Sequence, residues 1–550
     1  MGTPDERPDI VIILADDLGY SDIGSYGSEI ATPHLDALAA SGVRMSQFYN
    51  TARCSPSRAS LLTGLHPHQT GIGVLTRDDG PGGYRGTLST DCATMAEVLG
   101  AAGYATAMAG KWHLTGQLKA PDDTWPTRRG FQRHYGIIAG GSSYYQPVTL
   151  TEDEQPVEVD EDYYLTTALG DRAAGFIRDH AAERPEQPLF LYLAVTAPHW
   201  PLHAPEDVVE PYVERYRAGW DRLREERRAR QVASGLIDDD WPLTERDPDV
   251  PAWDGTADQE WQARRMAVYA AQVELLDDAI GRVVEAQAAA GRLDNTMIIF
   301  LSDNGGCAEE MVPGYIDELP RPPLHSPAVT RSGDRVRCGN GPEIIPGGPD
   351  TYTSYGKPWA NLSNTPFREY KHWVHEGGIA TPLIAHWPSG LPAGVTVHAP
   401  YQLPDLMATV LEITGADYPT ERGPYPVPPA EGSSMLAAWR GADADNEDDH
   451  ELYWEHEGNG AIRRGRWKLV RKHARPWELY DLAADRSELV DRAADHPALV
   501  EELAVSYQKW ADRCGVQPRE QVLATHGERG AGPFLIVDGF KSAHPAEPSR

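Results

Sequence analysis

The sequence has few of the residues that stabilise secreted domains or span membranes. Its 550 residues include an odd number of cysteines without regular spacing, so we expect no disulfide framework. No run of about 18 apolar residues occurs, which predicts no transmembrane helix. The N-terminus has no basic segment followed by an apolar one, so no signal peptide is expected. These absences favour a soluble cytoplasmic protein. The cysteines are Cys54, Cys92, Cys307, Cys338 and Cys514.

Basic residues are also scarce. Lys and Arg number 50 against 82 Asp and Glu, which gives a net charge of −32. This charge excludes non-specific binding to nucleic acid or to an anionic membrane, because both require a basic surface. It would also repel an anionic substrate, so local cations or a metal ion would have to reverse the field at a site for one.

The chain does contain enough apolar material for a large core, and its length predicts two domains. Short apolar runs recur, and most lead into polar residues and then a helix. This order predicts an α/β fold with a doubly wound, mainly parallel sheet and with ligands at the carboxyl ends of the strands. The predicted strands are Asp9–Leu14, Tyr104–Met108, Pro188–Val195, Thr296–Leu301 and Ile379–His386.

The intervening and C-terminal segments differ in character. Residues 204–257 are charged and predict a helical excursion, and residues 311–360 are rich in Pro and Gly and predict a long loop. From Glu451 onwards, short strands and one helix (497–512) predict a small antiparallel domain. We therefore divide the chain into a catalytic domain (1–430), a C-terminal α+β subdomain (431–530) and a polar tail (531–550).

The stretch from Cys54 to Gly64 reads Cys-Ser-Pro-Ser-Arg-Ala-Ser-Leu-Leu-Thr-Gly. Pro56 suits the first helical position, and Ser57 is a capping-type residue. Arg58 lies four residues after Cys54, so one helical turn brings its guanidinium close to the cysteine. A nucleophile at a helix N-terminus beside a guanidinium is arranged to face an anion. A buried structural cysteine is the alternative, and the local pattern leaves both open.

Two pairs of oxygen-bearing residues follow buried strands. Asp16 and Asp17 follow the first strand, and Asp303 and Asn304 follow the strand at 296–301. If those strands are neighbours, the crowded carboxylates repel one another and need a cation. Oxygen ligands suit a hard ion, Ca²⁺ or Mg²⁺. Either pair alone could be an ordinary turn, but their joint placement favours a metal site.

The pattern Cys-x-Pro-Ser-Arg-x-x-x-Leu-Thr-Gly, with its seven fixed letters present, resembles the signature of the type I, formylglycine-dependent sulfatases. Gly103-Tyr104-Ala105-Thr106 and then Gly110-Lys111-Trp112-His113 match the second signature of that family. His199 in Ala-Pro-His-Trp-Pro-Leu and Lys371 in Thr-Pro-Phe-Arg-Glu-Tyr-Lys match further positions. Residues 365–388 most resemble the bacterial arylsulfatase branch of the alkaline phosphatase superfamily.

The resemblance implies an α/β, alkaline-phosphatase-like fold: a large mixed β-sheet sandwiched by helices, with a smaller C-terminal antiparallel sheet plus helix. It implies that a formylglycine-generating enzyme oxidises Cys54 to Cα-formylglycine. It also implies one Ca²⁺ per subunit, held by that residue and by Asp16, Asp17, Asp303 and Asn304. The catalytic set would be Cys54, Arg58, Lys111, His113, His199, Asp303 and Lys371.

In such a site the hydrated aldehyde attacks sulfur, and Asp303 accepts its proton. The cation, with Arg58, Lys111 and Lys371, neutralises the sulfuryl oxygens. His199 and Lys371 assist the leaving oxygen. His113 deprotonates the second hydroxyl, which expels sulfate without attack by water on sulfur.

Simpler interpretations exist for single residues. His113 and His199 could be core histidines, Lys111 could lie on the surface, and Lys371 could pair with Glu369 or Glu376 on an exposed face. For Cys307 we favour a packing role over a redox one. The tryptophans of the two excursions would suit an aromatic leaving group or could simply pack; they are Trp220, Trp241, Trp253 and Trp359.

Two rival functions follow from the same residues. A phosphonate monoester or phosphodiester hydrolase of the same superfamily would use the same nucleophile. A non-catalytic scaffold is the other rival, but it has no chemical reason to keep the nucleophile, metal ligands and leaving-group acid together. The sequence leaves the natural substrate open among aryl, alkyl and sugar sulfates.

Overall fold

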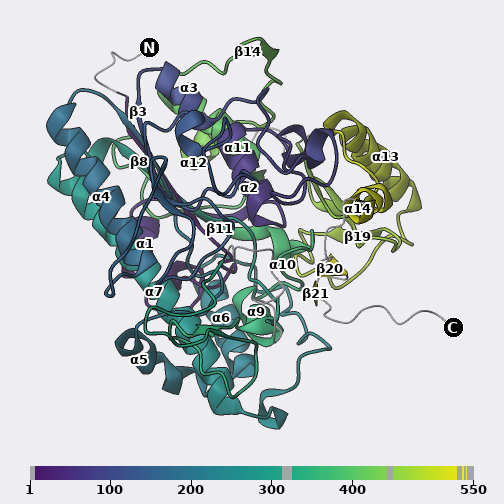
Figure 1. The fold of residues 1–550 in the computed structure, drawn as a ribbon. Coiled ribbons are helices and arrows are strands. Elements are labelled where there is room, and N and C mark those ends of the chain that lie inside the picture. Colours follow the sequence, from purple (N-terminus) through teal and green to yellow (C-terminus); the bar gives the residue numbers. More distant parts are fainter. Residues whose placement is uncertain (1–6, 312–324, 443–449, 529–535, 538–539, 542–550) are drawn as a thin grey trace.

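A large mixed β-sheet runs through the centre of the molecule (Figure 1). The computed structural model describes residues 7–311, 325–442, 450–528, 536–537 and 540–541. The strand order is β12-β2-β11-β8-β1-β7-β3-β4-β5-β6, and β13 pairs with β2. The strands are β1 (Asp9–Ala15), β2 (Val43–Tyr49), β3 (Ala105–Gly110), β4 (Arg133–Ile137), β5 (Leu150–Glu152), β6 (Gln155–Pro156), β7 (Leu189–Ala194), β8 (Thr296–Ser302), β11 (Ala380–His386), β12 (Val395–Val397) and β13 (Tyr401–Gln402).

Strand β1 occupies the middle of this sheet. It runs parallel to both β7 and β8, with Leu14 opposite Ala194 on one side and Leu301 on the other. Its side chains alternate between two cores, so that Val11 and Ile13 enter one core and the intervening residues enter the other. The continuous apolar run was therefore correctly predicted as a strand buried on both faces. Because β1 and β8 are neighbours, the residues that follow them meet at one edge of the sheet.

Helices cover both faces of the sheet (Figure 1). Helices α4 and α7 pack against each other, and α4 contacts β3 and β7 on one face. Helices α2, α3 and α11 contribute to the core on the other face. The helices of this part are α1 (Pro33–Ala40), α2 (Cys54–Thr63), α3 (Met95–Ala101), α4 (Leu165–Glu183), α5 (Glu206–Tyr216), α6 (Trp220–Ala233), α7 (Gln259–Ala289), α9 (Gly356–Ser363), α10 (Glu376–Ile379), α11 (Leu403–Thr414) and α12 (Leu436–Trp439).

The start of α2 differs from the prediction by two residues. Arg53 is the N-cap and Cys54 is the first helical residue, so Pro56 stands third and not first. A proline is tolerated there because the first-turn N–H groups have no acceptor within the helix. The hydroxyl of Ser57 does not cap the helix but bonds to Thr51 and to a backbone carbonyl after β8. These bonds tie the helix to the sheet edge.

The strand β2 was missed because polar residues interrupt its apolar pattern. It lies between β11 and β12, and Arg44 and Gln47 are its partly exposed positions. The excursion at 204–257 is helical as predicted, since it contains α5 and α6. The described part of the predicted loop at 311–360 contains the short strands β9 (Arg337–Cys338) and β10 (Thr351–Tyr352) and the first residues of α9. Residues 312–324 of that prediction lie outside the described residues.

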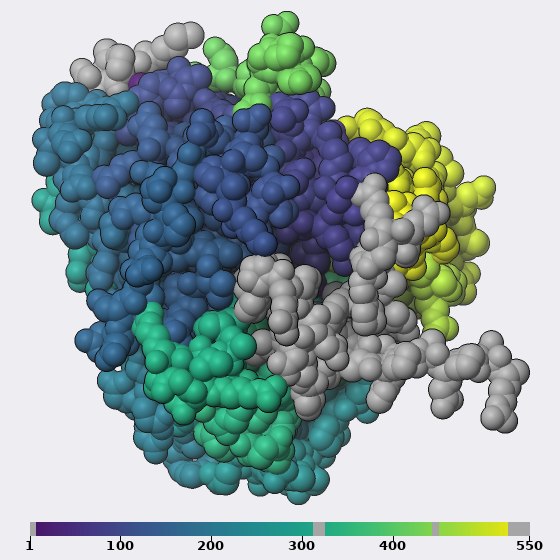
Figure 2. All heavy atoms as spheres, viewed as in Figure 1, coloured from purple at the N-terminus to yellow at the C-terminus, as the bar shows by residue number. Residues whose placement is uncertain are grey.

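A smaller antiparallel sheet forms the C-terminal part, in the order β16-β17-β18-β19. Helix α13 packs on one face, while residues such as Trp454 and Val470 join the main core on the other. Figure 2 shows the yellow C-terminal part lying against the purple N-terminal third, where Val522 packs on Val74 and Tyr84. The elements are β16 (Glu451–His456), β17 (Asn459–Arg464), β18 (Trp467–Arg471), β19 (Glu478–Asp481), α13 (Pro497–Cys514) and α14 (Arg519–Glu528).

This architecture confirms the predicted fold class. The domain boundary at residue 431 stays a prediction, and most of the predicted tail lies outside the described residues. No helix in the described part of the chain combines the length and the apolar character needed to cross a membrane. Short strand pairs complete the described elements: β14 (Glu421–Arg422) with β15 (Tyr425–Pro426), and β20 (Ile536–Val537) with β21 (Phe540–Lys541).

Candidate active site

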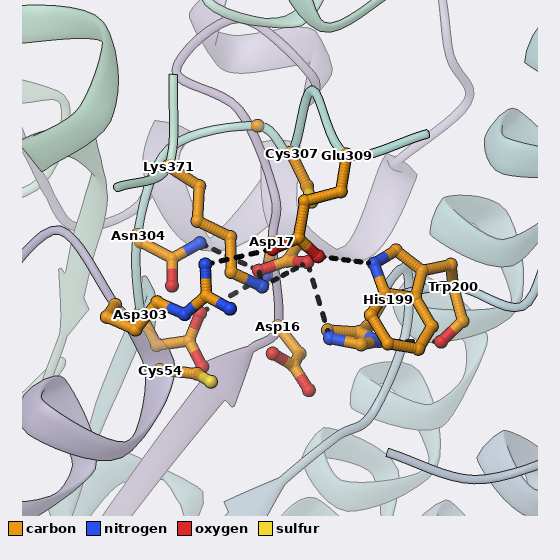
Figure 3. Close-up of polar contacts among 12 residues, drawn as sticks. Asp16, Asp17, Cys54, His199, Trp200, Asp303, Asn304, Cys307, Glu309 and Lys371 are labelled. Carbon is orange, nitrogen blue, oxygen red and sulfur yellow. Dashed lines mark hydrogen bonds and ion pairs between the residues drawn. The ribbon is translucent and has the colours of Figure 1, made fainter. Parts of the chain in front are cut away.

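The predicted site residues converge at the carboxyl edge of the central strands (Figure 3). They come from segments that are far apart in the chain: the ends of β1, β3, β7 and β8, the first turns of α2, and the loop before α10. All of them are buried. The structure therefore brings together the complete predicted set, which consists of Asp16, Asp17, Cys54, Arg58, Lys111, His113, His199, Asp303, Asn304 and Lys371.

Each carboxylate of this cluster has a cationic partner. Lys111 Nζ lies 2.6 Å from Asp16 Oδ2, and Arg58 Nη2 lies 2.8 Å from Asp303 Oδ2. Lys371 Nζ lies 2.7 Å from Asp17 Oδ1. Buried charges are tolerated only when they are paired in this way. The three carboxylates and the three cations thus balance in formal charge.

Asp17 lies at the centre of the hydrogen-bond network. Its backbone is left-handed, with φ of 64°, and its N–H donates to Asp303 Oδ1 at 3.2 Å. Asn304 Nδ2 donates to Asp17 Oδ1 at 2.8 Å, and His199 Nε2 lies 3.5 Å from Asp17 Oδ2. The rare backbone conformation turns this carboxylate toward the residues after β8.

The cluster also contains oxygen atoms that the protein does not satisfy. Asp16 Oδ1 and Asn304 Oδ1 are buried and have no hydrogen-bond partner among the described residues. Ligand atoms of Asp16, Asp17 and His199 lie within 4.8 Å of one another. Buried oxygens without donors are costly, and a hard divalent cation would satisfy them. The residues present therefore fit a divalent metal ion.

Burial and ion pairing shift the pKa values of these groups. Burial raises the pKa of Asp16 to about 8, against the opposing effect of Lys111. Burial acts in the same direction on Asp17, but Lys371 and His199 hold the pKa of its carboxyl well below the ordinary range. The pKa of Lys371 is raised well above its usual value because Asp17 outweighs the effect of burial. Lys371 is thus a fixed cation.

Cys54 faces His113. The thiol Sγ and His113 Nδ1 are 3.4 Å apart. Burial, followed by the neighbouring Lys111 and Arg58, lowers the pKa of His113 well below its ordinary value, so the imidazole is neutral. A Cβ at Gly140 would lie 2.3 Å from His113 Nε2, so only glycine allows this close approach. Sequence reasoning missed Gly140, although the Gly-Gly pair after a strand was a signal for it.

The simpler interpretation of Lys371 was wrong. Glu369 pairs with Lys472 at 2.6 Å and Glu376 pairs with Lys468 at 2.8 Å, while Lys371 turns inward to Asp17. Cys307 also lies beside Lys371 (Figure 3). Burial raises the pKa of the Cys307 thiol well above its ordinary value, which keeps it protonated and supports the packing role.

The tryptophans of the excursions pack on one another and on backbone. Trp220 meets Trp253 edge to face at 4.7 Å between ring centroids, and Trp359 lies 5.2 Å from Trp220. Trp241 donates its indole N–H to the carbonyl of Ala483 at 3.1 Å. These contacts support the packing alternative rather than an aromatic wall for a leaving group.

A different aromatic side chain borders the site. The ring of Trp200 lies 4.3 Å from the ring of His199, and its indole N–H donates to Glu309 Oε2 at 3.1 Å. Glu309 Oε1 pairs with Arg53, next to Cys54, at 3.0 Å. Trp200 stood beside a predicted site residue in the sequence, but Arg53 and Glu309 carried no spacing signal because their contact joins distant segments.

Comparisons with known proteins identify the family. The sequence model described as sulfatase matches residues 8–416, well over half of the chain. The chain belongs to the sulfatase family, and the enzyme is a sulfuric ester hydrolase. A model described as the C-terminal part of N-sulphoglucosamine sulphohydrolase matches residues 368–508.

Individual relatives extend this similarity. The arylsulfatase of Klebsiella aerogenes is 34% identical over 449 residues, which cover 78% of this chain and 92% of the relative. An uncharacterized sulfatase of Schizosaccharomyces pombe is 32% identical over 514 residues, covering 88% and 89% of the two chains. The crystal structure of Ps i-CgsB in complex with k-i-k-neocarrahexaose has a TM-score of 0.67 at 24% identity, covering 96% of this chain and 98% of that one. That likeness shows the fold.

Proposed function

We propose that this sulfatase cleaves sulfate monoesters of the arylsulfatase type through a Cα-formylglycine made from Cys54. One Ca²⁺ would be held by that residue and by Asp16, Asp17, Asp303 and Asn304. The observation that carries the proposal is the position of Cys54: it is buried at the N-terminus of α2, among the paired cations and the unsatisfied oxygens. Maturation would require a formylglycine-generating enzyme as partner. The similarity to an arylsulfatase over most of the chain supports the aryl class of substrate.

The two groups that the chain acquires would supply distinct chemistry. The hydrated aldehyde offers one hydroxyl as nucleophile and a second whose deprotonation releases sulfate. A divalent cation held by Asp16, Asp17, Asp303 and Asn304 would supply Lewis-acid chemistry at this site.

The charges of the cluster explain how an acidic protein can accept an anionic ester. Arg58 and Lys111 are held in place by Asp303 and Asp16, and the guanidinium of Arg58 interacts electrostatically with residue 54. The formal charges of the cluster cancel, and the raised pKa of Asp16 can only make the protein part more positive, so a divalent cation would leave the site net positive. A sulfate monoester carries a single negative charge and matches this local field, against the net charge of −32 for the chain.

The shifted pKa values indicate which residue can accept a proton and which residue remains a cation. Neutral His113, at 3.4 Å from Cys54 Sγ, can accept a proton from the group at residue 54. Lys371 remains protonated, so it is the cation that supports the leaving oxygen. Burial lowers the pKa of His199 well below its ordinary value, so the ring is neutral, and its single N–H is on Nδ1, which donates to the carbonyl of Trp200 at 2.6 Å. His199 Nε2 is therefore an acceptor, and Lys371 is the donor to the leaving oxygen.

Peptide mass spectrometry across Cys54 tests the nucleophile. Conversion should leave the peptide lighter by about the mass of one water, and the converted fraction should track specific activity across preparations made with and without the maturation enzyme. Cys54→Ala is the matched control and should be inactive in both. Full activity in a preparation whose Cys54 is entirely unmodified would overturn the mechanism.

A matched pair of substrates separates sulfatase from phosphodiesterase action. An aryl sulfate and an aryl phosphodiester with the same leaving phenol should differ in kcat/KM in favour of the sulfate. Asp303→Ala should abolish turnover of both and weaken Ca²⁺ binding, because the carboxylate is both ligand and acceptor. A higher kcat/KM for the phosphodiester would favour the rival function, and undiminished turnover after chelation would exclude the role of the metal.

A further inference from the structure

A second group of metal-binding side chains lies beside the loop that carries Lys371. His372 follows that lysine, and His456 and Glu457 lie at the tip of the β16–β17 hairpin. One ligand atom from each of the three residues lies within 4.8 Å of the others. We propose that His372, His456 and Glu457 bind a second divalent cation, of the zinc type. The inference does not depend on the function of the first cluster.

The two histidines present nitrogens that the protein leaves unsatisfied. His372 Nδ1 and His456 Nε2 have no hydrogen-bond partner in the described part of the chain, although the residues are only 1% and 2% exposed. The ring centroids are 5.2 Å apart, and the planes are nearly perpendicular at 82°. Glu457 Oε2 lies 3.7 Å from His372 Nδ1. A cation between these atoms would satisfy both nitrogens, and burial without a partner is otherwise unfavourable.

The backbone holds these residues in unusual conformations. His372 has φ of 91°, and its N–H donates to the carbonyl of Ala52 at 2.8 Å. Glu457 has φ of 49° in the hairpin turn, where His456 is paired with Asn459. Positive φ is uncommon for residues with a Cβ, so surrounding bonds must fix both positions. The ligands are therefore preorganised on two separate elements.

The charges around the three ligands are of both signs. Arg53 pairs with Glu309 at 3.0 Å, and Lys472 pairs with Glu369 at 2.6 Å. Arg519 lies 3.9 Å from Glu457. Glu455, which lies 2.7 Å from His68, adds a fourth carboxylate. Arg77 also faces Glu457, so four cations stand against four carboxylates and the formal charges around the three ligands balance.

The donor set distinguishes this site from the first. Two imidazoles and one carboxylate suit a borderline metal such as Zn²⁺ or Co²⁺, whereas the oxygen-rich first cluster suits Ca²⁺. His372 Nε2 lies 3.4 Å from Asn459 Nδ2. The amide N–H of Asn459 donates to Nε2, so Nδ1 is the nitrogen of His372 that remains for a metal. A bound ion would join the loop of Lys371 to the C-terminal sheet.

Titration with Co²⁺ tests the proposal, because its visible absorption reports coordination independently of turnover. The full chain is treated with a chelator, saturated with Ca²⁺ to fill the first cluster, and titrated with Co²⁺. We expect one equivalent to bind with the bands of a four- or five-coordinate site, and Zn²⁺ to displace it. Absence of any such binding would overturn the proposal.

Variants locate the ion. His372→Gln and His456→Gln should weaken Co²⁺ binding about 100-fold or more. His134→Gln, which removes another buried imidazole with an unsatisfied nitrogen, should bind like the parent. Asp17→Asn should also retain the signal, and its loss there would place the ion in the first cluster instead.

A third substitution keeps the test decisive if the histidine variants do not fold, as judged by circular dichroism. Glu457 is only partly buried at the hairpin tip, so Glu457→Gln should fold. We expect it to weaken Co²⁺ binding at least tenfold. Unchanged affinity in this variant, or in a folded His456→Gln variant, would overturn the assignment.

Discussion

Two clusters of buried charged residues in this protein differ in how completely their oxygens are paired. The first is the candidate active site around Asp17. The second joins the C-terminal sheet to the catalytic part, where Lys468 Nζ lies 2.8 Å from Glu376 and 2.9 Å from Glu488. Arg486 pairs with the other oxygen of Glu376 at 3.0 Å, and Tyr49 donates to the same oxygen. Both clusters are fully buried.

The two clusters differ in whether any of their buried oxygens lacks both a hydrogen bond and a cationic partner. In the second, each oxygen of Glu376 has a cation, and Glu488 Oε1, which has no hydrogen bond among the described residues, lies 2.9 Å from Lys468 Nζ. The pairing therefore holds two parts of the fold together. In the first, each carboxylate also has a cation, yet Asp16 Oδ1 and Asn304 Oδ1 remain unsatisfied. Buried oxygens that have neither a hydrogen bond nor a cationic partner, rather than buried charge as such, distinguish the cluster that fits an ion from the cluster that is fully paired.

Substituting Lys468 should have the largest effect on stability. Lys468→Met leaves Glu376 and Glu488 with one cation fewer in a buried site, which should lower the free energy of unfolding by about 3–5 kcal/mol. Turnover per folded molecule should change little, because Lys468 contacts no predicted site residue. Denaturant unfolding and active-site-normalised kinetics measure the two quantities. A stability close to that of the parent would show that the second cluster does not hold the C-terminal sheet.

Substituting Lys371 should reduce turnover strongly and should lower stability less than substituting Lys468 does. Lys371→Met removes a fixed cation from the first cluster, and kcat should fall about 10²–10³-fold. The bound metal ion should partly compensate Asp17, so stability with Ca²⁺ present should fall by less than in the Lys468 variant. Steady-state kinetics on an aryl sulfate, with thermal unfolding in Ca²⁺, test this. A variant with parental kcat would remove Lys371 from the proposed mechanism.

The smallest expected effect is an acid-dependent loss of stability. Lys468 and Arg486 outweigh burial and lower the pKa of Glu376 to about 2, against 4.5 in an unfolded chain. The stabilisation is therefore complete above pH 4.5 and disappears as the pH falls toward 2. It amounts to at most about 3 kcal/mol. Unfolding free energies of the parent and of Glu376→Gln, measured over this range, should converge as pH falls. A constant difference would contradict the assigned pKa.

Much of the fold was predictable because the central strands are continuous apolar runs with polar residues at their ends. Such runs identify strands that are buried on both faces, as in β1 and β8. The polar-interrupted β2 was missed because its pattern is that of a partly exposed strand. The start of α2 was misplaced because proline suits more than one position of a first turn.

The convergence of the predicted site residues at one edge of the sheet could be anticipated from the sequence, but their ion pairs could not. The motifs around Cys54, Lys111 and His199 consist of residues that are close in the chain, so they can be recognised in the sequence alone. The contacts of Arg53 with Glu309, and of Glu309 with Trp200, join segments that no motif links. Only folding brings these segments together.

The sequence by itself determined the chemical types present: a cysteine at a helix start, carboxylates after buried strands, and few lysines. The tertiary structure decided which of these charges meet. Lys371 and Asp17 are separated by 354 residues, and local spacing equally allowed Lys371 to pair with Glu369 or Glu376. Coulomb and desolvation energies depend on distance and burial, and only the folded chain sets those quantities.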